Sequence, residues 1–99
     1  MAYKVTNVWA RENTSIDWYR PNTDQKNHFT STYDNTGKRT SATSTESADE
    51  LTLTNISVFA NSAAKTDWDD DSTCSSFREA RKTYYRNNGV EYVCTIDDT

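Results

Sequence analysis

The sequence predicts an α+β domain over residues 1–99, in which helices pack on one face of a four-stranded antiparallel sheet. Three observations lead to this fold class. Strand-type and helix-type segments alternate along the chain, residues 51–60 and 90–96 are rich in apolar strand formers, and a capped helix enters the second of these segments through a glycine. A chain of 99 residues is near the usual size of one domain, so one core is expected.

The composition argues against several classes of protein. Only 33% of the residues are hydrophobic, but 12% are aromatic, and each aromatic ring can bury roughly 150–250 Å². The formal net charge of −4 argues against a nucleic-acid partner, which requires clustered cations. No segment approaches the roughly 20 apolar residues of a membrane span, and the first ten residues lack a signal-peptide core. We therefore expect a soluble cytoplasmic protein without a nucleic-acid or membrane partner.

The first strand is expected at residues 3–10, with Tyr3, Val5 and Trp9 on one face and Val8 and Ala10 on the other, so both faces carry apolar residues. Residues 11–22 form either an extension of this strand or a loop. A helix is predicted from residue 22 or 23 to Gly37, because good N-cap residues precede it and glycine often ends a helix. Its apolar stripe is thin and consists of Phe29 and Tyr33.

The next two segments predict a pair of strands. Residues 38–47 are rich in threonine and serine, which suits either an edge strand or a disordered linker. Residues 51–60 give the strongest strand signal in the chain, with Leu53 on one face and Ile56 and Val58 on the other. This arrangement predicts a change of strand phase near Asn55.

The last part of the chain predicts a broken helix. A short helix begins at residue 61 or 62, and the three aspartates at 69–71 form the solvated acidic start of a second helix, since calcium-loop spacing is absent. Ser76 and Glu79 are placed as a capping box for that second helix, which ends at Gly89. Its basic residues are explained by their place toward the helix C-terminus; they are Arg78, Arg81, Lys82 and Arg86.

The final strand, residues 90–96, carries Tyr92, Cys94 and Ile96 on one face and Val93 on the other, and is expected to pair inside the sheet. Cys94 is expected to be a small buried hydrophobe. Cys74 is expected in a loop beside acidic residues that raise its pKa. The two cysteines are too few and too isolated to predict a disulfide framework or a zinc site.

The resulting order of strand, helix, strand, strand, broken helix and strand is the ferredoxin-like, split βαβ order. Helices can cover one face of such a sheet, and the apolar residues of the other face need a partner. A second copy of the chain would cover them through an isologous interface. The residues expected in this homodimer interface are Val8, Ala10, Ile56, Val58 and Val93.

This order resembles the dimeric α+β barrel superfamily, which includes the antibiotic biosynthesis monooxygenase domain. The resemblance runs from Tyr3 to Asp97 and is carried by the helix "SSFREARKTYYRNNG", the strand "VEYVCTI" after it and the short helix with Trp68 before it. The segment "TSIDWYRPN" and the threonine-rich hairpin depart from the usual members and suggest a divergent branch, of phage or marine environmental origin. The resemblance implies a homodimer and a pocket between helices and sheet in each subunit.

The superfamily includes cofactor-independent oxygenases and enzymes that degrade haem with an asparagine, a tryptophan and an iron-ligating histidine. Asn7 and Trp68 match the first two, but Phe77 stands where the histidine would be expected, so we expect no cofactor and no metal. His28 is a candidate general base or a surface histidine. Asn7 either serves the site or pairs across the dimer.

Four aromatic residues are candidates for contact with a ligand, the alternative being core or dimer packing; they are Trp18, Tyr19, Tyr33 and Phe77. Three functions stay open. A non-catalytic binding or structural module predicts a filled interior, whereas a cofactor-independent monooxygenase or isomerase acting on a small hydrophobic ligand predicts a cavity of roughly 300 Å³ or more. A phage virion or host-interaction component is compatible with the hairpin and the acidic surface.

Overall fold

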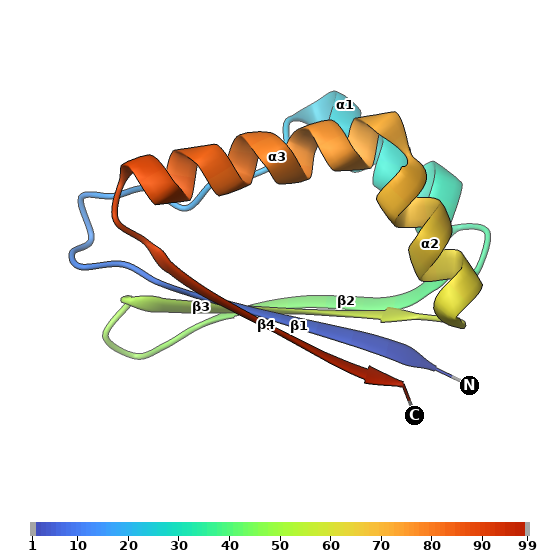
Figure 1. Ribbon diagram of the computed structural model, residues 1–99, viewed down its shortest axis with the longest axis horizontal. Helices are drawn as coiled ribbons and strands as arrows, with labels where there is room; N and C mark the ends of the chain where they lie inside the picture. The colour runs from blue at the N-terminus through green and yellow to red at the C-terminus, as the bar shows by residue number, and fades with distance from the viewer. Residues whose placement is uncertain (1, 99) are drawn as a thin grey trace.

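The computed structural model describes residues 2–98, which form one four-stranded antiparallel sheet with all helices on one face (Figure 1). The elements in chain order are β1 (Tyr3–Ala10), α1 (Thr23–Phe29), a π-helical turn η1 (Thr30–Asp34), β2 (Arg39–Glu46), β3 (Thr52–Phe59), α2 (Ser62–Asp70), α3 (Ser72–Asn87) and β4 (Glu91–Asp98). The strands lie in the order β2-β3-β1-β4. This confirms the predicted ferredoxin-like order and fold class.

The position of β2 at one edge of the sheet confirms the interpretation of the threonine-rich segment. The position of β4 does not match the prediction, because β4 pairs with β1 alone and forms the opposite edge. Cys94 is therefore exposed and not buried. Gly89, with a φ of 69°, supplies the left-handed residue that turns the chain from α3 into β4.

The long helix α3 begins five residues earlier than predicted. The side chain of Asp71 accepts hydrogen bonds from the backbone N–H groups of Thr73 and Cys74, so Asp71 caps the helix and Ser76 lies inside it. Cys74 is thus a buried helical residue, not a loop residue. No helix within residues 2–98 is both long and apolar enough to cross a membrane.

The inner face of the sheet, which faces the helices, keeps an unbroken register through β3, β1 and β4, and the pairing of β2 with β3 has one irregularity, between Arg39 and Ser41. Val5 and Trp9 of β1 are buried on this face, as predicted, and Leu53 and Phe59 are buried beside them on β3. The β1–β3 pairing continues without a shift through Asn55, so the predicted phase change is wrong. Strand β3 instead carries polar residues at two inward positions, Asn55 and Ser57.

Aromatic clusters hold the helices at the two ends of the sheet. At one end Trp9 lies 5.6 Å from Tyr85 of α3, between ring centroids. At the other end Trp68 of α2 contacts Phe59 of the sheet at 5.6 Å and Phe29 of α1 at 4.8 Å. The core of this polar chain is therefore built mainly from rings, as the aromatic composition indicated.

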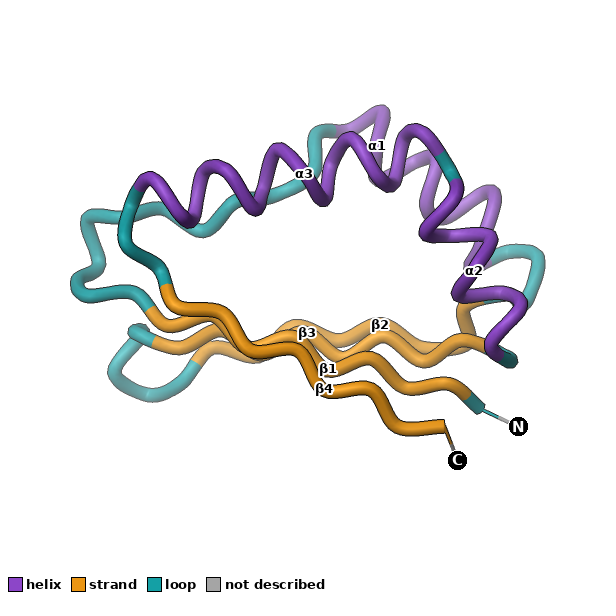
Figure 2. Tube along the Cα trace, in the orientation of Figure 1, coloured by secondary structure: helices purple, strands orange, loops and turns teal. Residues whose placement is uncertain are grey.

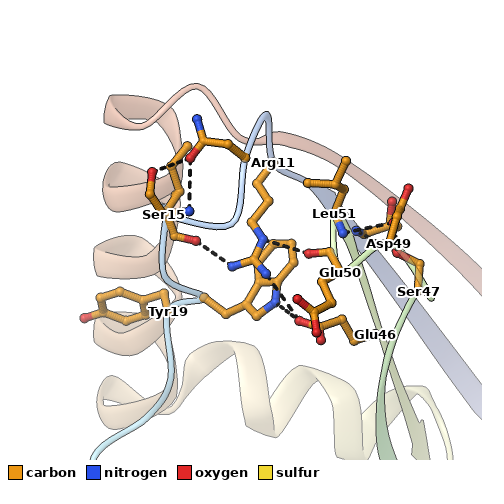
Figure 3. Close-up of polar contacts among 12 residues, drawn as sticks. Arg11, Ser15, Tyr19, Glu46, Ser47, Asp49, Glu50 and Leu51 are labelled. Carbon is orange, nitrogen blue, oxygen red and sulfur yellow. Dashed lines mark hydrogen bonds and ion pairs between the residues drawn. The ribbon is translucent and has the colours of Figure 1, made fainter.

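Arg11 ties the segment 11–22 to the turn between β2 and β3, and both lie at the same end of the molecule (Figure 2). Its guanidinium donates to the backbone oxygens of Glu50 (2.9 Å) and Ile16 (2.6 Å) and lies 3.5 Å from a carboxylate oxygen of Glu46 (Figure 3). It also covers the ring of Trp18 at 4.2 Å. Segment 11–22 is therefore an ordered loop.

Truncating Phe59 to alanine should cost about 3–5 kcal/mol of unfolding free energy, because its ring is 2% exposed and supports Trp68. Chemical denaturation followed by circular dichroism measures this loss. Thr43→Ala, on the exposed edge strand, is the matched control and should change stability by less than about 0.5 kcal/mol. Equal effects of the two changes would contradict the assignment of Phe59 to the core.

Candidate functional site

A cavity of about 410 Å³ lies between the helices and the inner face of the sheet. Its floor comes from β1, β3 and β4, and its walls and roof come from α1, α2, α3 and the segment before α1. Figure 1 shows how α3 runs above the sheet from β4 at one end to α2 at the other. The volume falls within the range of about 300–1,000 Å³ that is typical of small-molecule sites.

The cavity exists because the middle of the sheet floor carries small polar side chains. One row of the register joins Ser44, Asn55, Asn7 and Cys94, one residue from each strand. The large side chains of the floor lie at either side of this row, where they contact the helices. Small side chains in the middle row cannot fill the space under helices held apart by rings.

Two asparagines supply directed polar atoms on this floor. The hydroxyl of Tyr92 donates a 2.7 Å hydrogen bond to Oδ1 of Asn7. Burial and the neighbouring Cys94 thiol raise the pKa of Tyr92 to about 12, so this donor keeps its proton. Oδ1 of Asn55 is buried and has no hydrogen-bond partner within residues 2–98. Such an atom costs about 1–3 kcal/mol unless a ligand or water supplies a donor.

The lining of the cavity is strongly basic, although the chain as a whole carries a net charge of −4. Six cationic side chains and one carboxylate lie along it. The cations are Arg20, Lys26, Arg39, Lys65, Arg78 and Arg81, and the carboxylate is Asp69. The site therefore has a charge of opposite sign to that of the whole molecule.

Some of these cations already have partners. Arg39 makes a two-pronged contact with Asp34, at 2.6 and 3.0 Å. Asp69 accepts hydrogen bonds from Lys65 and, at 3.1 Å, from Arg78. The charged groups of Arg39, Lys65 and Arg78 are therefore already paired with carboxylates of the protein.

Arg81 has no such partner. Its guanidinium carbon lies 4.7 Å from the ring centre of Trp9 on the sheet and 5.1 Å from that of Phe77 on its own helix. It makes no hydrogen bond or ion pair with any other residue of the described chain, 2–98. Burial lowers the pKa of this guanidinium, which nonetheless stays charged in proteins. Arg81 is thus a sequestered cation held by aromatic faces alone.

Four of the seven residues predicted for the site line the cavity, namely Asn7, Trp68, Tyr19 and Phe77. The ring of Tyr19 lies 5.5 Å from that of Phe77, so the two form one aromatic wall. Trp18 lies elsewhere, because its indole N–H donates to Glu46 at 2.6 Å. His28 and Tyr33 also lie outside the lining, in a separate network.

That network centres on Asp71, the cap of α3. Nε2 of His28 and the hydroxyl of Tyr33 lie 2.7 and 2.8 Å from the same carboxylate oxygen of Asp71. Burial alone would raise the pKa of Asp71, but these hydrogen bonds and those from Thr73 and Cys74 lower it to about 2. The network joins α1 and η1 to α3, and it fixes His28 away from the cavity.

His28, Asp71 and Cys74 lie close enough to share a metal ion, with ligand atoms within 4.8 Å of one another. Their chemistry favours a structural role instead. Both oxygens of Asp71 already accept hydrogen bonds within the protein. Burial and the Asp71 charge raise the pKa of the Cys74 thiol to about 12, as the acidic surroundings indicated, which disfavours the thiolate that binds metals.

Sequence reasoning missed Asn55 and Arg81. Asn55 was assigned to a change of strand phase, although its place opposite Asn7 in a strand otherwise rich in apolar residues was a signal for a polar floor. Arg81 was assigned to the helix dipole. Its spacing from Phe77 and Tyr85 on one helical face was the available signal that it points toward the sheet.

Comparisons with solved structures identify the fold. A Bacteroides thetaiotaomicron protein of unknown function, proposed to be an oxidoreductase, matches with a TM-score of 0.70 at 6% identity over 99% of this chain and 97% of its own. The Mycobacterium tuberculosis protein Rv0793 matches at 0.62 and 12% identity, over 100% of this chain and 95% of its own. A proposed antibiotic biosynthesis monooxygenase from Deinococcus radiodurans matches with a TM-score of 0.58 at 7% identity, over 98% of this chain and 91% of its own.

The chain has the ferredoxin-like fold of the antibiotic biosynthesis monooxygenases. This confirms the resemblance found in the sequence, and identities of 6–12% make the chain a divergent example of the fold. No protein-family profile matches the chain, and no curated protein sequence matches it either. At such identities the likeness to the antibiotic biosynthesis monooxygenase fold concerns the backbone, and the chemistry of the site depends on the side chains of this chain.

Asp71→Asn should lower stability at neutral pH by about 2 kcal/mol, because the folded state lowers the pKa of Asp71 to about 2 and its side chain is 15% exposed. A lowered pKa stabilises the ionised form. The difference in unfolding free energy between wild type and Asp71→Asn should therefore have its maximum near pH 6, decrease below about pH 4 and vanish near pH 2. Denaturation as a function of pH measures it.

Asp70→Asn is the matched control for this experiment, since Asp70 is an exposed neighbour of the same charge. It should change stability little at any pH. A difference between wild type and Asp71→Asn that stays constant from pH 7 to pH 3 would show that the carboxylate charge is not what stabilises the network.

Proposed function

We propose that this chain is a homodimeric domain that binds a small organic molecule in the cavity between its helices and its sheet. The observation that carries the proposal is the cavity itself, about 410 Å³ in volume and lined by Asn7 and Trp68. A filled interior was expected for a non-catalytic binding or structural module, and the open cavity contradicts that expectation. An open cavity supports a binding role over a purely structural one. The unpartnered Oδ1 of Asn55 supports a ligand further, because a bound donor would satisfy it.

A cofactor-independent enzyme of the monooxygenase or isomerase class is the second candidate. It is supported by the fold shared with a proposed oxidoreductase and a proposed monooxygenase. Within the cavity Asn7 would orient a substrate and Asp69, its lining carboxylate, would accept a proton, since His28 lies outside. Oxygen uptake and product formation with phenolic substrates, in wild type and Asn7→Ala, test this candidate; ligand binding without turnover favours the first.

Filling the cavity should abolish ligand binding. Ser57 lines the floor from β3, so Ser57→Trp places an indole in the space and should weaken the binding of 2-naphthol, a neutral apolar probe, at least tenfold. Isothermal titration calorimetry measures the affinity. Thr83→Trp adds the same bulk at an exposed position of α3 and should leave binding unchanged. Equal affinity in wild type and Ser57→Trp would reject the cavity as the binding site.

The homodimer would form through the outer face of the sheet, opposite the helices. The register places Val8 directly between Val93 on one side and Thr54 on the other, with Ile56 and Val58 on the same face. Val93 is 62% exposed and needs a cover that the helices cannot provide. A second sheet packed face to face would supply it. The role of the chain as a virion or host-interaction component stays a prediction from sequence.

Val93→Asp should convert the dimer into a folded monomer. A carboxylate at an apolar interface must be desolvated, so association should weaken at least tenfold. The stability of the monomer should change little, because residue 93 is exposed when the chain is alone. Sedimentation velocity measures the mass, and circular dichroism reports folding. Thr83→Asp, on the exposed side of α3, is the control for the added charge. A wild type that is monomeric at tens of micromolar would overturn the dimer proposal.

A further inference from the structure

From the groups that the cavity leaves without partners we infer that its ligand is an aromatic carboxylate, with the carboxylate on Arg81, a flat ring between the aromatic walls and a hydroxyl donor toward Asn55. This rests on the proposed function and adds the chemical class of the ligand. Three features of the site carry it: the charge of the lining, the state of Arg81 and the unsatisfied oxygen on the floor.

The charge of the lining selects an anion. Six cations face one carboxylate in a space partly closed to solvent, where charges are screened less than at the surface. A cationic ligand would be repelled. A neutral apolar ligand would fill the space but would leave Arg81 without a counterion. An anion is the ligand whose binding lowers the electrostatic energy of the site.

Arg81 identifies where the anionic group binds. Its guanidinium lies near the rings of Trp9 on the sheet and Phe77 on its own helix, and these aromatic faces orient it. The N–H groups on its edge have no partner within residues 2–98. A guanidinium fork matches the geometry of a carboxylate, which it binds through two parallel hydrogen bonds. The other partly buried cations of the lining already have carboxylate partners, because Arg39 is paired with Asp34, and Lys65 and Arg78 are paired with Asp69.

The walls of the cavity select a flat apolar body. Tyr19, Phe77 and Trp68 line it, and the ring of Phe29 lies 4.8 Å from that of Trp68 and 5.7 Å from that of Phe77. A planar aromatic ring can stack against or pack edge-on to such rings with favourable geometry. An aliphatic carboxylate would satisfy Arg81 but would gain less from these walls.

Asn55 sets the far end of the ligand. Trp9, whose ring contacts the guanidinium of Arg81, has Asn7 as its neighbour on the same face of β1. Asn7 pairs with Asn55 on the neighbouring strand. Rows on one face of a strand are about 7 Å apart. Asn55 therefore lies one row and one strand away from Trp9, and its unpartnered Oδ1, as an acceptor, calls for a hydroxyl donor on the ligand.

Calorimetry with three probes tests this assignment: 2-naphthoate, its neutral isostere 2-naphthamide, and 6-hydroxy-2-naphthoate. Wild type should bind the carboxylate about tenfold more tightly than the amide, because a hydrogen-bonded charge pair forms with the carboxylate alone. Arg81→Gln should abolish this preference and Arg81→Lys should restore part of it. The hydroxylated probe should bind about fivefold more tightly than 2-naphthoate in wild type and lose that gain in Asn55→Ala.

Arg86→Gln is the matched control, because Arg86 is a cation of the same helix that lies outside the cavity lining. It removes the same charge and should keep the tenfold preference. Circular dichroism checks that each variant is folded, and Arg81→Lys keeps the test decisive should Arg81→Gln fold poorly. A preference lost equally in Arg81→Gln and Arg86→Gln would overturn the assignment to Arg81.

The outcomes also separate this inference from the proposed function. Equal binding of 2-naphthoate and 2-naphthamide, both abolished by Ser57→Trp, would overturn the anionic ligand and leave the binding function standing. No binding of the naphthyl probes, 2-naphthol included, would overturn both.

Discussion

The architecture depends on one constraint, which is that large rings hold the helices at the two ends of the sheet while the middle row of the sheet is small and polar. Trp9 packs on Tyr85 at one end, and Phe59 packs on Trp68 at the other. Between these supports Asn7 and Asn55 face the helices without filling the space below them. The cavity therefore follows from side-chain size along the inner face of the sheet.

Arg11 stabilises the loop 11–22, which has few aliphatic residues of its own. Arg11 is 9% exposed, donates to two backbone oxygens and stacks on Trp18, so it fastens segment 11–22 to the β2–β3 turn. Hydroxyls of α3 reach the same segment, because the Tyr85 hydroxyl accepts from the backbone N–H of Tyr19 at 2.7 Å. Tyr19 is thereby fixed against the cavity, so a contact that stabilises the loop also shapes the site.

The fold was predictable from sequence because its signals are local. Alternation placed Val5 and Trp9 on one face of β1, and glycine marked the end of α3, so the element order followed. The start of α3 was not predictable in this way, because Asp71 and Ser76 can both act as the N-cap. Contacts of Asp71 with His28 and Tyr33, which are distant in sequence, decide between the two residues. The role of Arg81 was hidden for the same reason, since Trp9 comes from another element.

The unpartnered groups of the site also connect stability with binding. A sequestered cation and a buried carbonyl oxygen without a donor both lower the stability of the empty protein. A molecule that satisfies both binds the folded state alone, because the unfolded chain does not bring Arg81 and Asn55 together. Binding therefore raises the free energy of unfolding, by an amount that grows with the logarithm of the free ligand concentration. A small aromatic core with an open cavity can therefore be stable in the bound state, since the ligand would supply the contacts that the chain itself does not make.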